Sequence, residues 1–353
     1  MIAGTLAALG EREVVSRLID LLPRAPFLVG GVGNDAAALD IGLPDGKLLL
    51  VNSDRTGVNL AFQLELSSPV CIGDLAVSHA VSDIYACGGL PNAITTVLLL
   101  PADTSCEFAE DIQRGAVEAA TRYGAFIVGG DTKHSSTVTI VVTAMGLVPR
   151  DQLLLRSGAQ PGDLVCVTGV LGDFLVAVAA MRHRMSIPMD LEPTLRNALL
   201  RQHPPFSLAP SLAAARVAHS CTDISDGFPG AVHGVASLSR LGTLIEESCL
   251  PIRPEVLEFG RGLGLTPMQL ASAGGDWQFL YAIPPARISE AELIALEGGH
   301  KLSVVGEFTA DSAIAYRPVD GAIRGLDRFE HDSFIPGRSG KSFFDRFGDP
   351  ERR

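Results

Sequence analysis

Hydrophobic and polar positions in the first half of the chain alternate in blocks that predict a mixture of helices and strands. Apolar residues recur at helical spacing in some blocks and form continuous runs, typical of buried strands, in others. The predicted helices are 11–22, 73–86 and 106–123, and the predicted strands are 47–52, 93–100, 124–128 and 137–148. Aspartates follow several of these runs, so we expect carboxylates at the ends of buried strands.

A stretch rich in glycine and proline interrupts this pattern at 150–162, and a similar pattern then begins again. In the second half the predicted strands are 164–168, 242–247, 279–283 and 302–308, and the predicted helices are 174–181, 209–219 and 231–239. We expect irregular structure over the proline-rich segment 186–210 and a polar loop over 221–227. The chain is thus predicted to hold an N-terminal domain over 1–149, a C-terminal domain over 150–332 and a polar tail over 333–353.

Length and composition exclude some classes of protein. The 353 residues suffice for about two domains, and 47% hydrophobic against 19% charged residues argues against disorder. The net charge of −12 offers no basic surface for nucleic acid or an anionic membrane. No signal peptide or membrane-spanning run is recognised, so a cytoplasmic protein is expected. The six cysteines are widely spaced, which favours buried thiols over a zinc site.

Aspartates recur in glycine-rich surroundings that hold few other charges. They are Asp35, Asp54, Asp83, Asp131, Asp223, Asp226 and Asp276. Lysine is scarce in the chain, so few ammonium groups are available to pair with these carboxylates. A carboxylate beside apolar strands is costly unless it is paired or binds a cation, and Mg²⁺ prefers oxygen ligands together with substrate phosphates. The pattern therefore favours a Mg²⁺–nucleotide site built from loops of the first half.

Several of these residues could instead have a purely structural role, and the local sequence does not decide between that role and a metal site. Asp35 and Asp131 follow glycine and could form turns. Asp223 and Asp226 could cap the helix that follows them. Arg156 could be an ordinary surface residue. The single occurrences do not decide between these alternatives and a functional site.

Several segments in a fixed order resemble one superfamily of enzymes. They are Gly10-Glu-Arg-Glu-Val-Val-Ser-Arg-Leu, Gly33-Asn-Asp-Ala-Ala, Asn52-Ser-Asp, Ser82-Asp-Ile-Tyr-Ala-Cys-Gly-Gly, Gly129-Gly-Asp-Thr, Leu155-Arg-Ser-Gly-Ala-Gln-Pro-Gly-Asp and Asp223-Ile-Ser-Asp-Gly. The superfamily contains aminoimidazole ribonucleotide synthetase, thiamine-monophosphate kinase, selenophosphate synthetase and the hydrogenase-maturation carbamoyl dehydratase. The chain most resembles the thiamine-monophosphate kinases.

The resemblance implies an α/β (α+β) fold like that of aminoimidazole ribonucleotide synthetase, with an N-terminal mixed-sheet domain and a C-terminal α/β domain. ATP would lie between the domains, and two copies would form a homodimer through the sheets of their N-terminal domains. The implied Mg²⁺ ligands are Asp35, Ser53, Asp54, Asp83, Asp131, Asp223 and Asp226, and the implied ATP contacts are Gly130, Asp131, Arg156 and Ser225. Among them, Asp54, Asp131 and Asp226 would be the catalytic residues.

The chain departs from the kinase pattern mainly where the family binds its phosphate acceptor. The family's His and Glu are Ala61 and Gly275 here, and its late aromatic residue is Ile323. The Tyr of its Gly-Gly-Glu-Asp-Tyr segment is Trp277, for which core packing is the favoured interpretation, and the first Asp of Asp-Asp-Ala-Ala is Asn34. We expect an altered acceptor pocket that includes Phe62, Gly275, Asp276 and Trp277. The acceptor could be thiamine phosphate or another small molecule.

Two other interpretations stay open. The segment that begins at Ser82 is also similar to selenophosphate synthetase, but no Cys precedes Cys71 and no Lys precedes Lys47, where that family carries both. A non-catalytic, nucleotide-binding dimer would agree with Asn34 and the lost acceptor groups. The preferred hypothesis is an ATP- and Mg²⁺-dependent phosphotransferase, because the aspartates of the implied metal site are all present.

Overall fold

Two β-sheets, one in each half of the chain, organise the protein. The computed structural model describes residues 5–182, 185–328 and 334–335. Within them the N-terminal sheet has six strands in the order β1-β2-β3-β6-β4-β5. These are β1 (Leu28–Val29), β2 (Ala37–Leu39), β3 (Lys47–Gly57), β4 (Leu90–Leu100), β5 (Phe126–His134) and β6 (Thr139–Pro149). β4 and β5 run parallel, whereas the other neighbouring strands are antiparallel.

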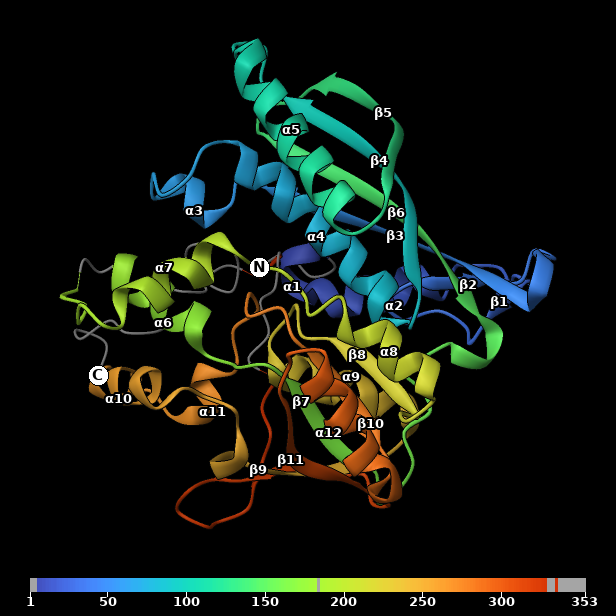
Figure 1. The fold of residues 1–353 in the computed structure, drawn as a ribbon, viewed down its shortest axis with the longest axis vertical. Coiled ribbons are helices and arrows are strands. Elements are labelled where there is room, and N and C mark those ends of the chain that lie inside the picture. Colours follow the sequence, from blue (N-terminus) through green and yellow to red (C-terminus); the bar gives the residue numbers. More distant parts are fainter. Residues whose placement is uncertain (1–4, 183–184, 329–333, 336–353) are drawn as a thin grey trace.

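Helices α4 (Val70–Ala86) and α5 (Cys106–Arg122) cover one face of this sheet (Figure 1). Even-numbered residues of β3 and β6 are mostly buried against the helices, while odd-numbered residues stay partly exposed on the other face. Glycine allows the two helices to approach closely, since a Cβ atom at Gly73 would lie 1.8 Å from the carbonyl oxygen of Ile112. The sheet therefore has one covered face and one open face.

The C-terminal sheet has seven strands within the described residues, in the order β13-β12-β9-β11-β7-β10-β8. These are β7 (Leu164–Thr168), β8 (Ser220–Asp223), β9 (Gly242–Glu246), β10 (Phe279–Ile283), β11 (Leu302–Thr309), β12 (Ile314–Arg317) and β13 (Arg324–Gly325). Strand β8 lies at one edge of the sheet, yet all its residues are buried. It is covered because α4 of the N-terminal half and α9 of its own half contact it.

The remaining helices surround these sheets. They are α1 (Leu6–Leu9), α2 (Glu11–Ile19), α3 (Leu60–Gln63), α6 (Asp173–Arg182), α7 (Glu192–Leu200), α8 (Leu208–Ala215), α9 (Phe228–Ser239), α10 (Pro254–Gly262), α11 (Pro267–Leu270) and α12 (Ile288–Glu297), with 3₁₀ turns at Pro44–Gly46, Arg150–Gln152, Glu247–Cys249 and Pro285–Arg287. One apolar core joins both halves, with Ile84 of α4 and Phe279 of β10 among its members. In the part of the chain that the structure describes, the helices are all too short or too polar to cross a membrane.

The mixed α/β architecture predicted from the sequence is confirmed, but several boundaries were wrong. β3 continues to Gly57 because β6 pairs with it along its whole length, so Asp54 lies inside the strand. β5 likewise continues through Asp131 to His134. The segment 186–210 contains helix α7, and Asp223 belongs to β8 and not to a loop. In each case a pairing or packing partner distant in sequence decides the local structure. The predicted tail, except 334–335, lies outside the described residues.

Candidate metal and nucleotide site

Three carboxylates from distant parts of the sequence meet where β8 packs against α4. Asp35 lies in the loop before β2, Asp83 near the C-terminal end of α4, and Asp223 at the end of β8. One oxygen atom of each lies within 4.8 Å of the others. Asp54 of β3 adjoins them, since the Asn52 amide donates to Asp83 Oδ2 at 2.6 Å and to Asp54 Oδ2 at 3.3 Å. We call these four aspartates the carboxylate cluster.

Burial and mutual repulsion raise the pKa values of three of these groups, Asp54, Asp83 and Asp223. Burial is the main cause in each case: it raises the pKa of Asp54, raises that of Asp223 to about 7, and raises that of Asp83 well above its usual range. Neighbouring carboxylates add to the effect, because like charges at this distance disfavour ionisation. A divalent cation between the carboxylates would reverse the balance and favour their charged forms.

Arg156 supplies a positive charge to the carboxylate cluster. Its Nη2 donates to Asp35 Oδ1 at 2.6 Å, and its Nε donates to the same oxygen at 3.1 Å and to Thr222 Oγ1 at 3.0 Å. The charge of Asp35 is the main cause that raises the pKa of Arg156 further above its usual range, so this side chain stays protonated. One arginine therefore balances part of the negative charge of the cluster.

Asn34 shapes the loop beside the cluster. Its amide nitrogen donates to the carbonyl oxygens of Gly30 and Gly31, both at 3.3 Å, and its Oδ1 accepts from the backbone N–H of Arg156 at 3.1 Å. An asparagine can donate and accept in this way, whereas an ionised aspartate can only accept. The replacement of the family's first Asp by Asn34 thus has a structural explanation.

Two buried oxygen atoms of the site have no hydrogen-bond partner among the described residues. They are Asp35 Oδ2 and Asn52 Oδ1. A buried acceptor without a partner is costly and uncommon in folded proteins. Carboxylate and amide oxygens are the ligands that Mg²⁺ prefers. The residues present therefore fit a divalent cation held by the cluster.

The carboxylate cluster lines a cavity of about 890 Å³, a volume typical of small-molecule sites. Most of the site residues predicted from the sequence lie around it. They are Asp35, Ser53, Asp54, Asp83, Arg156, Asp223, Ser225, Asp226 and Trp277, and the cavity also includes Glu11, Arg12, Arg55, His79 and Arg328. Phe62 does not line it, because its ring packs edge-on against Phe108 with the ring centroids 5.6 Å apart.

Gly130 and Asp131 do not join the cluster within one chain. They lie on β5, at the far edge of the sheet from the cavity. In the register of the sheet Asp54 pairs with Val142, Val142 with Thr96 and Thr96 with Gly130, so three strand spacings, about 14 Å, separate β3 from β5. Because successive residues of a strand point to opposite faces, Asp131 points to the open face, away from the face of Asp54.

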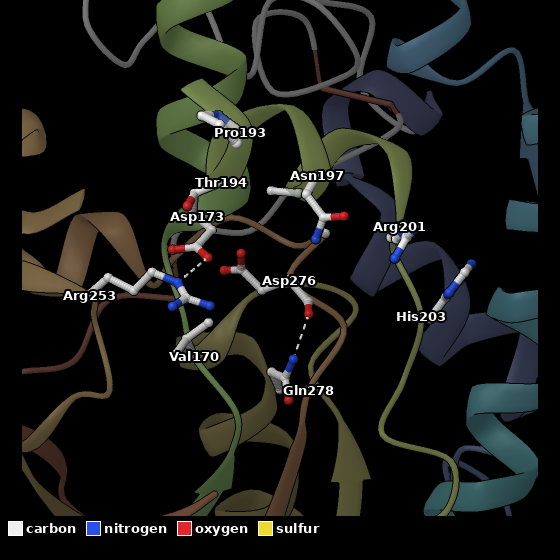
Figure 2. A pocket seen from close by; sticks show the side chains of 12 residues that line it. Val170, Asp173, Pro193, Thr194, Asn197, Arg201, His203, Arg253, Asp276 and Gln278 are labelled. Atoms are coloured by element: carbon white, nitrogen blue, oxygen red, sulfur yellow. Dashed lines mark hydrogen bonds and ion pairs between the residues drawn. The ribbon is translucent and has the colours of Figure 1, made fainter. Parts of the chain in front are cut away.

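The segment 275–278 contributes to this cavity and also to a second one of about 480 Å³, whose lining residues Figure 2 shows. Asp276 lines the second cavity, while Trp277 lines the first. The Asp276 carboxylate accepts from the backbone N–H groups of Gly172 at 2.6 Å and Phe174 at 2.9 Å, and so caps helix α6. Burial raises its pKa to about 7. The residues expected to form one acceptor pocket are thus divided between two cavities and the core.

Three polar residues of the site were not predicted from the sequence: Asn52, Ser82 and Thr222. Asn52 bonds two members of the cluster, Ser82 donates to Asp223 Oδ2 at 2.6 Å, and the Thr222 hydroxyl donates to Asp35 Oδ1 at 2.9 Å. Ser82 and Thr222 directly precede a predicted acid, and Asn52 lies two residues before one. A polar residue beside an acid in an otherwise apolar element is the signal that could have identified them.

Comparisons with known proteins agree with this fold. The family model for the N-terminal domain of AIR synthase related proteins matches residues 33–148, and the model for the C-terminal domain matches residues 160–317. The thiamine-monophosphate kinase of Pyrococcus abyssi is 32% identical over 82% of this chain and 86% of its own length. That of Rhodopirellula baltica is 31% identical over 93% and 98%. The solved structure of AaThiL complexed with AMPPCP and TMP has a TM-score of 0.77 and 25% identity, covering 92% of this chain and 99% of that one.

Proposed function

Because the chain belongs to the AIR synthase related family, with thiamine-monophosphate kinases among its relatives, we propose that it transfers the γ-phosphoryl group of ATP to a small-molecule acceptor. The relatives support an ATP-dependent kinase of this type. The observation that carries the proposal is the carboxylate cluster with its buried, unpartnered oxygen atoms. Such a cluster suits phosphoryl transfer, in which positioning and charge neutralisation matter more than covalent chemistry.

The residues of the cavity divide this task. Asp35, Asp54, Asp83 and Asp223 would hold Mg²⁺, with Ser53 and Asp226 at the margin of the cavity. Bound Mg²⁺ would supply charge neutralisation of the phosphate oxygens. Arg156, fixed by Asp35 and Thr222, would orient the nucleotide, and Ser225 would contact it. The rigid support of these side chains by α4 and β8 favours one geometry for in-line transfer.

We also propose that the acceptor pocket is altered. The two positions where the family carries His and Glu are Ala61 and Gly275. Ala61 belongs to a buried apolar cluster, and Gly275 packs against a member of that cluster. Phe174 belongs to that cluster with Ala61. A Cβ atom at Gly275 would lie 2.3 Å from Phe174 Cδ1, so the phenyl ring takes the space of a side chain at 275. An acceptor that relies on polar contacts from these two positions would find apolar packing there, which favours another small molecule over thiamine phosphate.

A homodimer through the open face of the N-terminal sheet would give Asp131 and Gly130 a role. Within the described residues β2 pairs only with positions 49–51 of β3, so the part of β3 that follows has no partner strand on that side. Strand β5 is the last strand on the other side of the sheet. When two such sheets pack face to face around a two-fold axis, β5 of one copy can lie beside β3 of the other. We propose that the partner subunit's Asp131 completes the site in this way, on the side of the cavity where Ser53 of β3 points to the same open face. We also propose that the boundary between the N-terminal and C-terminal domains lies near residue 149.

The direct test is Mg²⁺-dependent ADP formation from ATP, with and without thiamine monophosphate. We expect ADP formation by the wild-type protein and its loss in Asp54→Asn, since that change removes one oxygen ligand. Strong stimulation by thiamine monophosphate would contradict the altered acceptor pocket while supporting the kinase. ATP binding without any turnover would point to another acceptor or to a nucleotide-binding protein.

A further inference from the structure

Trp277 is one of the residues through which the C-terminal half contacts the turn of α4 that carries Asp83. Its side chain is only 5% exposed and lines the cavity of the carboxylate cluster. The indole stacks on His79 of α4, with ring centroids 3.7 Å apart and planes inclined by 29°. Its Nε1–H donates to Ser82 Oγ at 3.2 Å. His79 and Ser82 are three residues apart, so both lie on one face of the helix, and the tryptophan docks on that face.

The hydrogen bond from Trp277 fixes the direction of the bonds that follow it. An indole N–H can only donate, so Ser82 Oγ accepts from it. The hydroxyl hydrogen of Ser82 is then directed to Asp223 Oδ2, at 2.6 Å. The other oxygen of this carboxylate, Oδ1, accepts from Ser225 Oγ at 2.9 Å. Each oxygen of Asp223 is thus held by a hydroxyl donor, and the carboxylate keeps one orientation within the cluster.

The backbone of Trp277 gives a second, independent reason to assign it a role. Its φ angle is +48°, in the left-handed region that bulky side chains rarely adopt. Such strain persists only where surrounding contacts offset it, and it concentrates at functional sites. The contacts available here are the stacking on His79 and the hydrogen bond to Ser82. The chain therefore keeps an unfavourable backbone conformation in order to place this indole on α4.

We propose that Trp277 is a positioning residue for the carboxylate cluster: through Ser82 it orients Asp223, and His79 holds the indole in place. The inference rests on the proposed Mg²⁺ site. Groups that orient metal ligands typically change metal affinity about tenfold or more when they are removed. The family's tyrosine at this position can donate or accept, so its hydroxyl does not impose one direction on Ser82. Tryptophan does.

The test is isothermal titration of the full-length protein with MgCl₂, using four variants. Trp277→Phe keeps a ring for stacking but lacks the N–H, and Ser82→Ala removes the next link. The double variant measures whether the two act together. Ser78→Ala is the matched control, because Ser78 is a buried serine of the same helix whose hydroxyl lies 2.9 Å from Tyr123 Oη, away from the site. Thermal unfolding checks that each variant is folded.

We expect Trp277→Phe and Ser82→Ala each to raise the Mg²⁺ dissociation constant about tenfold, with the double variant no weaker than either single variant. Ser78→Ala should bind Mg²⁺ like the wild type. The sole tryptophan also gives a readout without mutation of the indole, since its fluorescence should respond to MgCl₂ in the wild type and lose that response in Ser82→Ala.

Wild-type Mg²⁺ affinity in folded Trp277→Phe would overturn the inference, as would additive effects of the two changes. In either case Mg²⁺ binding by the wild type would leave the proposed function intact. No Mg²⁺ binding by the wild type would overturn the metal site itself. If Trp277→Phe does not fold, the affinity and fluorescence of Ser82→Ala decide, and an unchanged response to MgCl₂ in that variant refutes the proposal.

Discussion

Replacing Asp83 by asparagine should make the metal-free protein more stable and at the same time abolish its response to Mg²⁺. Asp83 has a carboxylate oxygen within 4.8 Å of those of Asp35 and Asp223. Two unit charges at that distance repel by about 3.5 kcal/mol at an effective dielectric constant of about 20. Arg156 and partial protonation of Asp83 offset much of this repulsion, so we expect a gain of about 1–3 kcal/mol. The asparagine can still accept the hydrogen bond from Asn52.

The sign of the pH dependence follows from the raised pKa of Asp83. A group whose pKa is higher in the folded than in the unfolded state contributes stability at low pH, and this is lost as the pH rises through the folded value. The ordinary pKa of an aspartate is 3.8, so the metal-free wild type should lose stability from near pH 4 upward, and Asp83→Asn should lose less. The difference between them should grow as the pH rises. With MgCl₂ present the order reverses, because only the wild type gains stability from the bound ion.

The assay is urea or thermal unfolding at several pH values, with EDTA and with MgCl₂. In EDTA at pH 8 the expected gain corresponds to a rise in Tm of roughly 1–4 °C for a chain of this size. Asp74→Asn is the matched control on the same helix. Burial alone would raise the pKa of Asp74, but its bonds to His203 and Arg122 lower it to about 2, so its loss should destabilise the protein by about 1–2 kcal/mol. Destabilisation by both changes would refute the view that the cluster is repulsive without a cation.

Three further predictions follow from the same geometry. Arg156→Met leaves the buried Asp35 without its guanidinium partner. The change should therefore lower the free energy of unfolding by about 2–4 kcal/mol and abolish ADP formation. Denaturant unfolding in EDTA measures the loss of stability, and an unchanged midpoint would contradict it. Gly275→Glu should lower Tm, because the new side chain meets Phe174 and the backbone at 275 has a φ of +116°. Adding Phe174→Ala should recover part of this loss and increase the stimulation of ADP formation by thiamine monophosphate. Equal Tm values for Gly275→Glu and the wild type would show that the Phe174 ring moves aside easily. Asp54→Asn and Asp131→Asn should each be inactive alone, but co-expressed subunits should recover about a quarter of the wild-type rate, because half of the dimers hold one intact site of two. No recovery would show that Asp131 does not act across a dimer.

The sequence was informative where local pattern and structure agree. The small residues of α4 and the long apolar run of β6 predicted their elements, and the glycine-rich surroundings of the aspartates predicted a metal site. The extent of β3 could not be predicted in the same way, because its pairing with β6 carries the strand five residues further, to Gly57. Asp54 consequently lies within a strand, and its amide neighbour Asn52 becomes part of the site.

Other features depend on contacts between distant segments. Asp83 and Asp223 are 140 residues apart, and only the packing of β8 on α4 brings them together. The position of Phe174 beside Gly275 is likewise invisible in either local segment, although it decides how much space the acceptor pocket retains. Asp131 has the right motif but lies on the opposite edge of its own sheet. In the proposed dimer its role depends on a second chain, and the pattern of one chain does not show how two copies pack.

The most direct measurement of the central claim is the location of a bound divalent cation. Crystals of the protein grown with MnCl₂ and a non-hydrolysable ATP analogue allow Mn²⁺ to be found from its anomalous scattering. The proposed site predicts a strong peak among the carboxylate oxygens of Asp35, Asp83 and Asp223, and its loss in Asp83→Asn. Nucleotide bound with no Mn²⁺ peak at these three residues, or with the peak elsewhere, would contradict the account.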